Sequence, residues 1–145
     1  MKKRLGRQIV FSLLCLSLAL PASAFAQAQA EKAKQLAFYL ERGKERLDKR
    51  EYDKALADFD AAVNISARDA KAFLWRGKAW LGKKDFNSAL KDFNRALRRD
   101  GNMAEAYFQR GQAYLQAGKQ AQAQKDFARA HELDASWPLD GKVAQ

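Results

Sequence analysis

The chain has 145 residues, enough for one domain or for one domain behind a processed leader. Hydrophobic residues make up 48% and charged residues 30%, which excludes a chain that is disordered by composition and allows a packed core. The 2 prolines and 8 glycines favour an all-helical chain, while the net charge of +10 permits nucleic acid, an anionic membrane or an acidic protein as partner.

Residues 1–26 predict a cleaved secretory signal peptide. Basic residues at positions 2–4 and 7 precede the apolar run Ile9–Leu20, and small residues follow it. The run is shorter than the roughly 20 residues that a membrane-spanning helix needs. We place cleavage after Ala26, with Ala24 as the alternative site and an uncleaved anchor as the other outcome. Cleavage would leave a periplasmic or secreted protein without a stable membrane anchor.

The single cysteine, Cys15, lies inside this leader. Leu14 precedes it, whereas lipoprotein signals have a small residue there, so a lipid anchor is not expected. The mature chain would carry no thiol, and hence no disulfide and no cysteine nucleophile. Removal of the leader would lower the formal charge from +10 to +6, because the leader holds four basic residues and no acidic one.

The rest of the chain repeats itself every 34 residues, beginning with the Arg-Gly pairs at 42–43, 76–77 and 110–111. An aromatic residue precedes each glycine by four positions, and an Asp-Phe pair follows it in constant register. The small and aromatic positions that recur, and that we expect to be structural, are Gly43, Gly77, Gly111, Ala55, Ala89, Ala123, Phe59, Phe93, Phe127, Ala62, Ala96 and Ala130.

In chain order, the apolar spacing predicts helices at 31–48, 52–66, 69–82, 86–99, 103–116 and 120–133. Residues 27–35 extend the first of them towards the N-terminus. Asp69 and Asn102 stand where helix N-caps are wanted. The small residues let the two helices of each unit approach closely, and the phenylalanines fill the space between successive units.

This pattern resembles the tetratricopeptide repeat (TPR), a 34-residue unit with W-x₂-L-G-x₂-Y, then A-x₃-F, then proline. Tyr39, Phe73 and Tyr107 hold the place of the tryptophan. The chain departs from the pattern in having Arg before each glycine and no proline between units. The resemblance implies an all-α fold, a right-handed superhelical solenoid of three TPR helix hairpins. The repeats would span 36–69, 70–103 and 104–137, followed by a short tail at 138–145.

The resemblance also implies a concave groove lined by the first helix of each hairpin. Leu40, Trp75 and Phe108 would be its apolar anchors, with lysines between them and glutamines able to bond an extended backbone. Glu41 and Glu105 fall at two further groove positions. A peptide with apolar side chains and an acidic group would fit, although the positions do not match the family's carboxylate clamp of Lys and Asn. The predicted binding residues are Leu40, Lys44, Lys71, Leu74, Trp75, Lys78, Phe108, Gln109 and Gln112.

Catalytic and metal-binding constellations are not evident in the sequence. His131 is the only histidine, no Gly-rich phosphate loop occurs, and the aspartate of each Asp-Phe pair recurs as a structural residue does. We therefore expect no enzymatic activity, no cofactor and no metal. Nucleic acid is not expected either, because the basic group at Lys91, Arg95, Arg98 and Arg99 is interleaved with acids and no recognition motif accompanies it.

These observations favour a non-enzymatic scaffold or adaptor that binds a protein or peptide in its groove, in envelope assembly or secretion. The alternative is a structural protein that self-associates by stacking through its uncapped C-terminal helix, so a homo-oligomer is possible. Trp137 and Leu139 are expected to fold back over that helix; otherwise its apolar face is available to a second copy or a partner.

Overall fold

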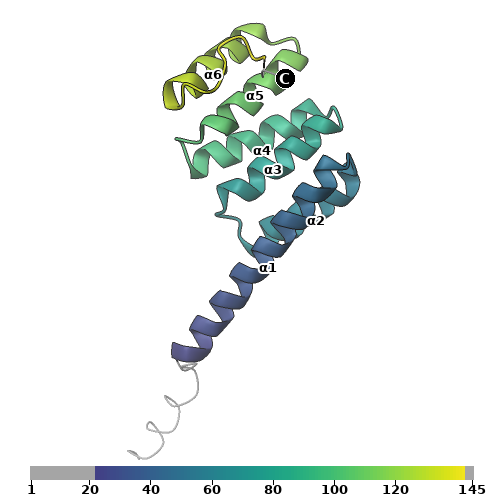
Figure 1. The fold of residues 1–145 in the computed structure, drawn as a ribbon, viewed down its shortest axis with the longest axis vertical. Coiled ribbons are helices and arrows are strands. Elements are labelled where there is room, and N and C mark those ends of the chain that lie inside the picture. The colour runs from purple at the N-terminus through teal and green to yellow at the C-terminus, as the bar shows by residue number, and fades with distance from the viewer. Residues whose placement is uncertain (1–21, 143–145) are drawn as a thin grey trace, which may run out of the picture. The chain divides into compact units, whose positions relative to one another are not determined.

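A computed structural model describes residues 22–142, which form six α-helices and no strand. The helices are α1 (Ala22–Asp48), α2 (Tyr52–Ile65), α3 (Ala70–Gly82), α4 (Phe86–Arg99), α5 (Ala104–Gln116) and α6 (Gln120–Leu133) (Figure 1). The all-α prediction is confirmed, and five of the six helices begin and end within one residue of the predicted positions. Most of the predicted leader, residues 1–21, lies outside the described part, so cleavage stays a prediction.

Helix α1 begins nine residues before the predicted start at residue 31. Residues 22–34 belong to a compact unit of their own, separate from the unit formed by residues 35–145. Their side chains are exposed, with the exception of the half-buried Ala24. Ala and Gln, which dominate this stretch, have high helix propensity, and this accounts for a helix that packing does not require. The helical extension predicted at residues 27–35 covers most of this stretch, and only residues 22–26 were assigned to the signal peptide instead.

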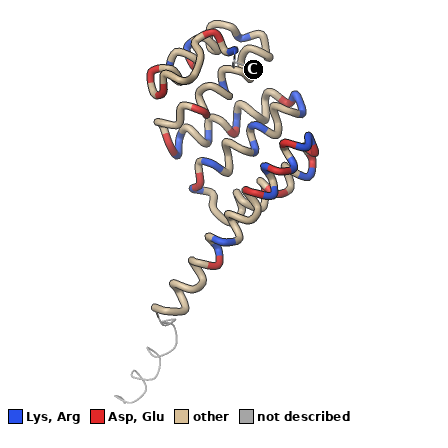
Figure 2. Tube along the Cα trace, viewed as in Figure 1, with Lys and Arg blue, Asp and Glu red and all other residues tan. Residues whose placement is uncertain are grey.

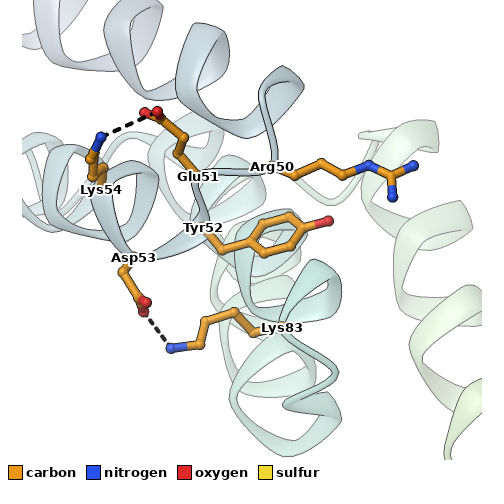
Figure 3. Close-up of a pocket in the computed structure, with 6 residues that line it drawn as sticks. All are labelled: Arg50, Glu51, Tyr52, Asp53, Lys54 and Lys83. Atoms are coloured by element: carbon orange, nitrogen blue, oxygen red, sulfur yellow. Dashed lines mark hydrogen bonds and ion pairs between the residues drawn. The ribbon is translucent and has the colours of Figure 1, made fainter.

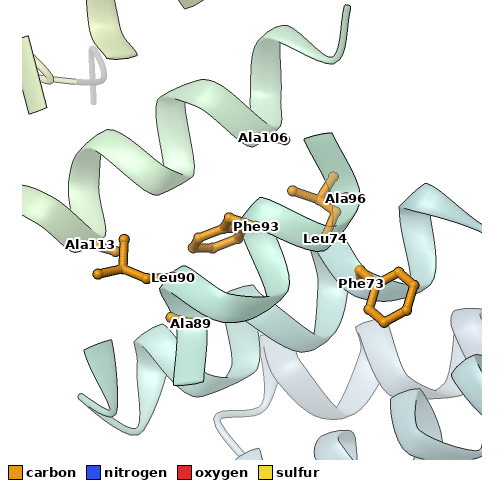
Figure 4. Packing of buried hydrophobic residues seen from close by; sticks show 8 residues of the cluster. All are labelled: Phe73, Leu74, Ala89, Leu90, Phe93, Ala96, Ala106 and Ala113. Atoms are coloured by element: carbon orange, nitrogen blue, oxygen red, sulfur yellow. The ribbon is translucent and has the colours of Figure 1, made fainter. Parts of the chain in front are cut away.

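Within the second unit, α1–α2, α3–α4 and α5–α6 form antiparallel hairpins, and α3 and α5 also pack on the second helix of the preceding hairpin. Glycine permits the close approach inside each hairpin. A Cβ built on Gly43, Gly77 or Gly111 would lie 2.5, 2.7 or 2.5 Å from a ring carbon of Phe59, Phe93 or Phe127. The alanines of the repeat pattern are all fully buried. Figure 4 shows Phe93 among residues of α3, α4 and α5, in the middle of the largest core cluster.

The three hairpin turns share a left-handed residue. Arg50, Lys84 and Gly118 have φ of 59°, 64° and 75°, and only the third is glycine. Asp69 caps α3 by accepting from the Ala72 N–H at 2.9 Å, which confirms that prediction. The prediction for Asn102 is wrong: Met103 is the N-cap of α5 and makes no side-chain bond, while the N–H of Asn102 donates to Asp100.

A buried arginine–aspartate fork joins the two helices of every hairpin. Asp58, Asp92 and Asp126 are only 2%, 2% and 6% exposed. Each accepts two or more hydrogen bonds from the arginine 16 residues before it, with the shortest at 2.7 Å in each fork. These hydrogen bonds raise the pKa of Arg42, Arg76 and Arg110, because the carboxylate stabilises the charged guanidinium. The fork explains why Arg replaces the leucine of the family pattern before each glycine.

Candidate peptide-binding surface

Trp75 lies at the centre of the predicted groove residues that the structure brings together. Its half-buried ring stacks on Phe59 of α2, with centroids 6.5 Å apart and planes inclined by 22°. Two ammonium groups lie over the same ring: Lys44 Nζ from α1 at 5.0 Å and Lys78 Nζ from α3 at 3.8 Å from the centroid. We call Lys44, Trp75 and Lys78 the Trp75 surface. It holds a rigid aromatic ring and two cations at one place.

Both lysines of the Trp75 surface are already paired with glutamates. Lys44 donates to Glu41 at 2.7 Å, and Lys78 donates to Glu105 of α5 at 2.8 Å. The sequence reasoning placed these glutamates at groove positions but gave them no role. The surface is therefore less positive than the lysines alone suggest. From residue 31 onwards, basic and acidic residues are interspersed along the helices (Figure 2).

Two predicted binding residues, the anchor Phe108 and the groove residue Leu74, are not available to a ligand, and this corrects the expectation. Leu74 is 3% and Phe108 is 1% exposed. Residues at this position of the repeat pack towards whatever follows their own hairpin. Leu74 lies in the core cluster that also contains Ala106 and Ala113 of α5, and Phe108 is covered by Trp137 in the segment after α6. Leu40, at the same position in the first repeat, is half-buried against the cluster around Phe59.

The remaining predicted residues differ in how they relate to the Trp75 surface. Lys71 is exposed one helical turn before Trp75 on α3, but the ammonium groups over the Trp75 ring are those of Lys44 and Lys78. Gln109 is half-buried on α5. Gln112 donates from its side chain to the carbonyl of Gly141, so the chain's own C-terminal segment occupies its amide. Gln112 also lines a shallow pocket together with Gln116 and residues at the junction of α3 and α4.

The segment after α6 covers the end of the last hairpin and runs back beside α5 (Figure 1). Trp137 packs on Phe108 with centroids 4.7 Å apart, and His131 Nδ1 lies 2.8 Å from the carbonyl oxygen of Trp137. The predicted fold-back is confirmed for Trp137 and wrong for Leu139, which is 56% exposed. The role of His131 in holding this segment was not foreseen, because no spacing rule links it to Trp137.

A second depression lies at the first hairpin turn and involves charged groups that bond one another. Arg50, Glu51, Tyr52, Asp53, Lys54 and Lys83 line it (Figure 3). Lys54 pairs with Glu51 at 3.2 Å, and Lys83 pairs with Asp53. The Lys83–Asp53 pair links the first hairpin to the second, whereas the Lys54–Glu51 pair lies within the first. The residues of this depression form no constellation for acid–base chemistry.

Two further features of residues 22–142 bear on the chemistry that they can support. No three His, Cys, Asp or Glu side chains in this part of the chain come together in a way that could hold a metal ion. None of its helices combines the length and the apolar character that crossing a membrane demands.

Comparison with known proteins identifies the repeats. Residues 40–102 and 104–137 each match a sequence model described as the tetratricopeptide repeat. A search of curated proteins finds no match. The second TPR domain of human RPAP3, in complex with an HSP70 peptide, is similar at TM-score 0.70 and 23% identity, covering 74% of this chain and 90% of that one.

Two other solved structures extend this likeness. The second TPR of Spaghetti (RPAP3), bound to an HSP90 peptide, has TM-score 0.70 and 26% identity, covering 74% of this chain and 99% of that one. The translocator chaperone SycD of Yersinia enterocolitica type III secretion has TM-score 0.68 and 21% identity, with coverage of 72% and 80%. Sequence and fold agree, and the chain belongs to the tetratricopeptide-repeat family.

Proposed function

We propose that this protein is a non-enzymatic interaction scaffold that binds an extended peptide segment of a partner protein across the Trp75 surface. The observation that carries the proposal is the half-buried Trp75 ring, which stacks on Phe59 and is flanked by two lysines. A preorganised aromatic ring contributes binding energy without losing much conformational freedom, and tryptophan is enriched among interface hot spots. TPR domains of similar fold are solved with peptides bound.

The peptide would carry an apolar side chain for Trp75 and a carboxylate for the lysines. Glu41 and Glu105 now hold those lysines, with side-chain exposures of 70% and 32%. Ion pairs this close to solvent are worth about 0–1 kcal/mol each. A carboxylate of the ligand can therefore replace either glutamate at little cost, and the exchange leaves Lys44 and Lys78 as the recognition groups.

The test is affinity capture of partners from cell-envelope extract. The bait is the form of the chain that accumulates in the cell. A Trp75→Ala, Lys78→Glu double variant, checked for helicity, should lose the partner that the wild type retains. Lys91→Glu is the matched control, because Lys91 is exposed on α4 and the substitution changes the charge equally. Equal capture by wild type and double variant would refute the proposed surface.

A gain-of-binding variant tests the acidic part of the proposal. Glu105→Gln removes the competitor of the ligand carboxylate at Lys78 while keeping the size of the side chain. The captured partner, once purified, should bind this variant more tightly, by about threefold to fivefold if up to 1 kcal/mol of ion pairing is released. Weaker binding would mean that Glu105 itself contacts the partner and that the ligand is not acidic at this point.

We further propose that the chain acts outside the cytoplasm, in the periplasm or after secretion, in envelope assembly or secretion. The basic start, the apolar run and the A-x-A exits of residues 1–26 support this location. N-terminal sequencing of the accumulated protein decides it. A first residue of Gln27 or Phe25 would establish cleavage after Ala26 or Ala24, and an intact Met1 would contradict the proposed processing.

A further inference from the structure

The arginines of the forks also link one hairpin to the one before it. Arg76 binds Asp92 of its own hairpin through Nε and Nη2, and its Nη1 donates to Asp60 of α2 at 2.8 Å. Arg110 repeats the arrangement, with its Nη1 donating to Asn94 of α4 at 2.7 Å. Each of these two junctions therefore contains a buried or half-buried arginine whose third donor reaches an acid or amide on the preceding helix.

Arg42 has the same fork but not the same third bond. Its Nε and Nη2 donate to Asp58, and within residues 22–142 no acceptor contacts its Nη1. Its side chain is 39% exposed, against 13% for Arg76 and 20% for Arg110. Residues 1–30 contain no Asp, Glu or Asn, the residue types that accept from Arg76 and Arg110 or could replace those acceptors most closely; their only side-chain amides are those of Gln8, Gln27 and Gln29.

Aromatic side chains surround this open guanidinium. Phe38 is 55% exposed, and its ring centroid lies 4.7 Å from Arg42 Cζ. Tyr39 lies edge-on to Phe38 at 5.4 Å and is also within 5.4 Å of the guanidinium. A partly exposed arginine that has aromatic rings against it and a donor without an acceptor among residues 22–142 has the composition of an interface hot spot. We call Phe38, Tyr39 and Arg42 the N-terminal face.

The other end of the repeat stack does not complement this face. Alanine occupies position 128, where the two preceding repeats have the acceptors Asp60 and Asn94. Trp137 also covers Phe108 there. A second copy stacked end to end would thus bring no acceptor to Arg42 at the position used by the internal junctions, and would first have to displace its own C-terminal segment.

We propose that the N-terminal face docks a helix of another protein, one that carries Asp or Asn for Arg42 and an aliphatic residue three positions later. The two internal junctions provide the pattern. Asp60 precedes Val63 and Asn94 precedes Leu97, and both aliphatic residues pack against the largest core cluster. Residues three apart lie on the same helix face, so one helix presents both groups.

The partner helix is not a regular further repeat. Phe38 stands where the following repeats have Ala72 and Ala106, which are 0% exposed. A helix packed as closely as α2 packs on α3 would meet the Phe38 ring. The partner must therefore present small residues there, so that the ring inserts beside the ion pair. This surface is separate from the Trp75 surface, and the inference does not depend on the peptide proposed for that surface.

The test uses a helix-stabilised, fluorescent peptide that copies residues 52–66, which contain Asp60 and Val63 and are rich in alanine. Its affinity for the full chain is measured by anisotropy beside two control peptides. One has Asp60→Ala, and the other moves the acid by one position (Asp60→Ala, Ala61→Asp) at unchanged charge. The Asp60 peptide should bind about threefold to fivefold more tightly than either, because Asp60 is 55% exposed where it pairs with Arg76 and so contributes about as much as the Glu105 ion pair.

Chain variants assign the peptide to a surface. Phe38→Glu removes the ring, adds an acid beside Arg42 and leaves Asp58 untouched, so it should abolish the preference for the Asp60 peptide while helicity is preserved. The Trp75→Ala, Lys78→Glu variant should keep it. Equal binding of all three peptides, no binding at millimolar peptide, or loss in the Trp75 variant instead would overturn the proposal. So would a dimer of the chain that Phe38→Glu dissociates, because it would assign the face to a second copy.

Discussion

Gly77 determines how closely α3 approaches α4, because a side chain there would enter the space of Phe93. A Cβ added to Gly77 would lie 2.7 Å from a ring carbon of Phe93, which is itself fully buried and has no room to retreat. Alanine gains about 1 kcal/mol of helix propensity over glycine. Overpacking costs about 1–3 kcal/mol, so after the gain in propensity we expect Gly77→Ala to lower the free energy of unfolding by up to about 2 kcal/mol in urea denaturation.

Gly101→Ala is the matched control for this prediction. Gly101 lies in the loop between α4 and α5, and the nearest atom to its added Cβ is the Leu97 carbonyl oxygen at 3.8 Å. The substitution should change stability by less than about 0.5 kcal/mol. If both variants lost the same stability, the close approach of the helices would not be the reason for the glycine of the repeat.

The left-handed turn residues give a second prediction at this scale. Lys84 has φ of 64°, a conformation that costs a non-glycine residue about 1–2 kcal/mol. Glycine removes that strain but adds freedom to the unfolded chain, so Lys84→Gly should stabilise the protein by about 0.5–1 kcal/mol. Gly118, at the same place in the third turn with nothing within 4 Å of its Cβ, should show the reverse when changed to alanine. Thermal denaturation measures both effects: the melting temperature should rise for Lys84→Gly and fall for Gly118→Ala.

At the scale of the helix, the contribution of an N-cap can be tested most directly in α4, where Asp85 is the N-cap. Asp85 accepts from the Ser88 N–H at 3.0 Å and from its hydroxyl at 2.8 Å, and these bonds lower the pKa of Asp85 below its ordinary value of 3.8. The stabilisation is therefore complete above that ordinary value and is lost as the pH falls through the lower folded pKa. Asp85→Ala should cost about 1 kcal/mol at pH 7.

The pH dependence separates the cap from other effects of the substitution. The stability difference between wild type and Asp85→Ala should shrink as the pH falls below about 4, because the protonated aspartic acid is a weaker acceptor. Asp85→Asn keeps a neutral cap, so it should retain most of the stability at pH 7. A difference that stayed constant down to about pH 2 would show that the carboxylate is not the stabilising group.

The helices were predictable because a 34-residue period without insertions fixes every position by its neighbours in the other repeats. The residues of the binding surface were less predictable. Phe108 and Leu74 were assigned to the groove by register, but their burial depends on what covers each hairpin, which a repeat pattern does not state. The arginine–aspartate forks were overlooked although their signal, a constant spacing of 16 residues, was present in the sequence.

At the scale of the whole molecule, the two ends of the stack differ in how they meet solvent. On the N-terminal face, Arg42 and Phe38 are exposed to solvent, whereas the last hairpin is covered by the segment that contains Trp137. In a repeat protein each hairpin is stabilised only by its neighbours, so an uncovered end lowers the stability of the terminal hairpin first. The C-terminal segment thus takes the place of the next repeat for α5 and α6.

Trp137→Ala should therefore destabilise the third hairpin more than the second. The half-buried Trp137 ring packs on Phe108, and its loss should cost about 2 kcal/mol, roughly half the value for a fully buried tryptophan. Hydrogen exchange should report faster opening of α5 and α6 with α3 nearly unchanged. Leu139→Ala is the control, because Leu139 is 56% exposed and its loss should have little effect. Uniformly faster exchange in all helices would instead mean that the stack unfolds as one unit, with the segment stabilising the whole fold rather than its end.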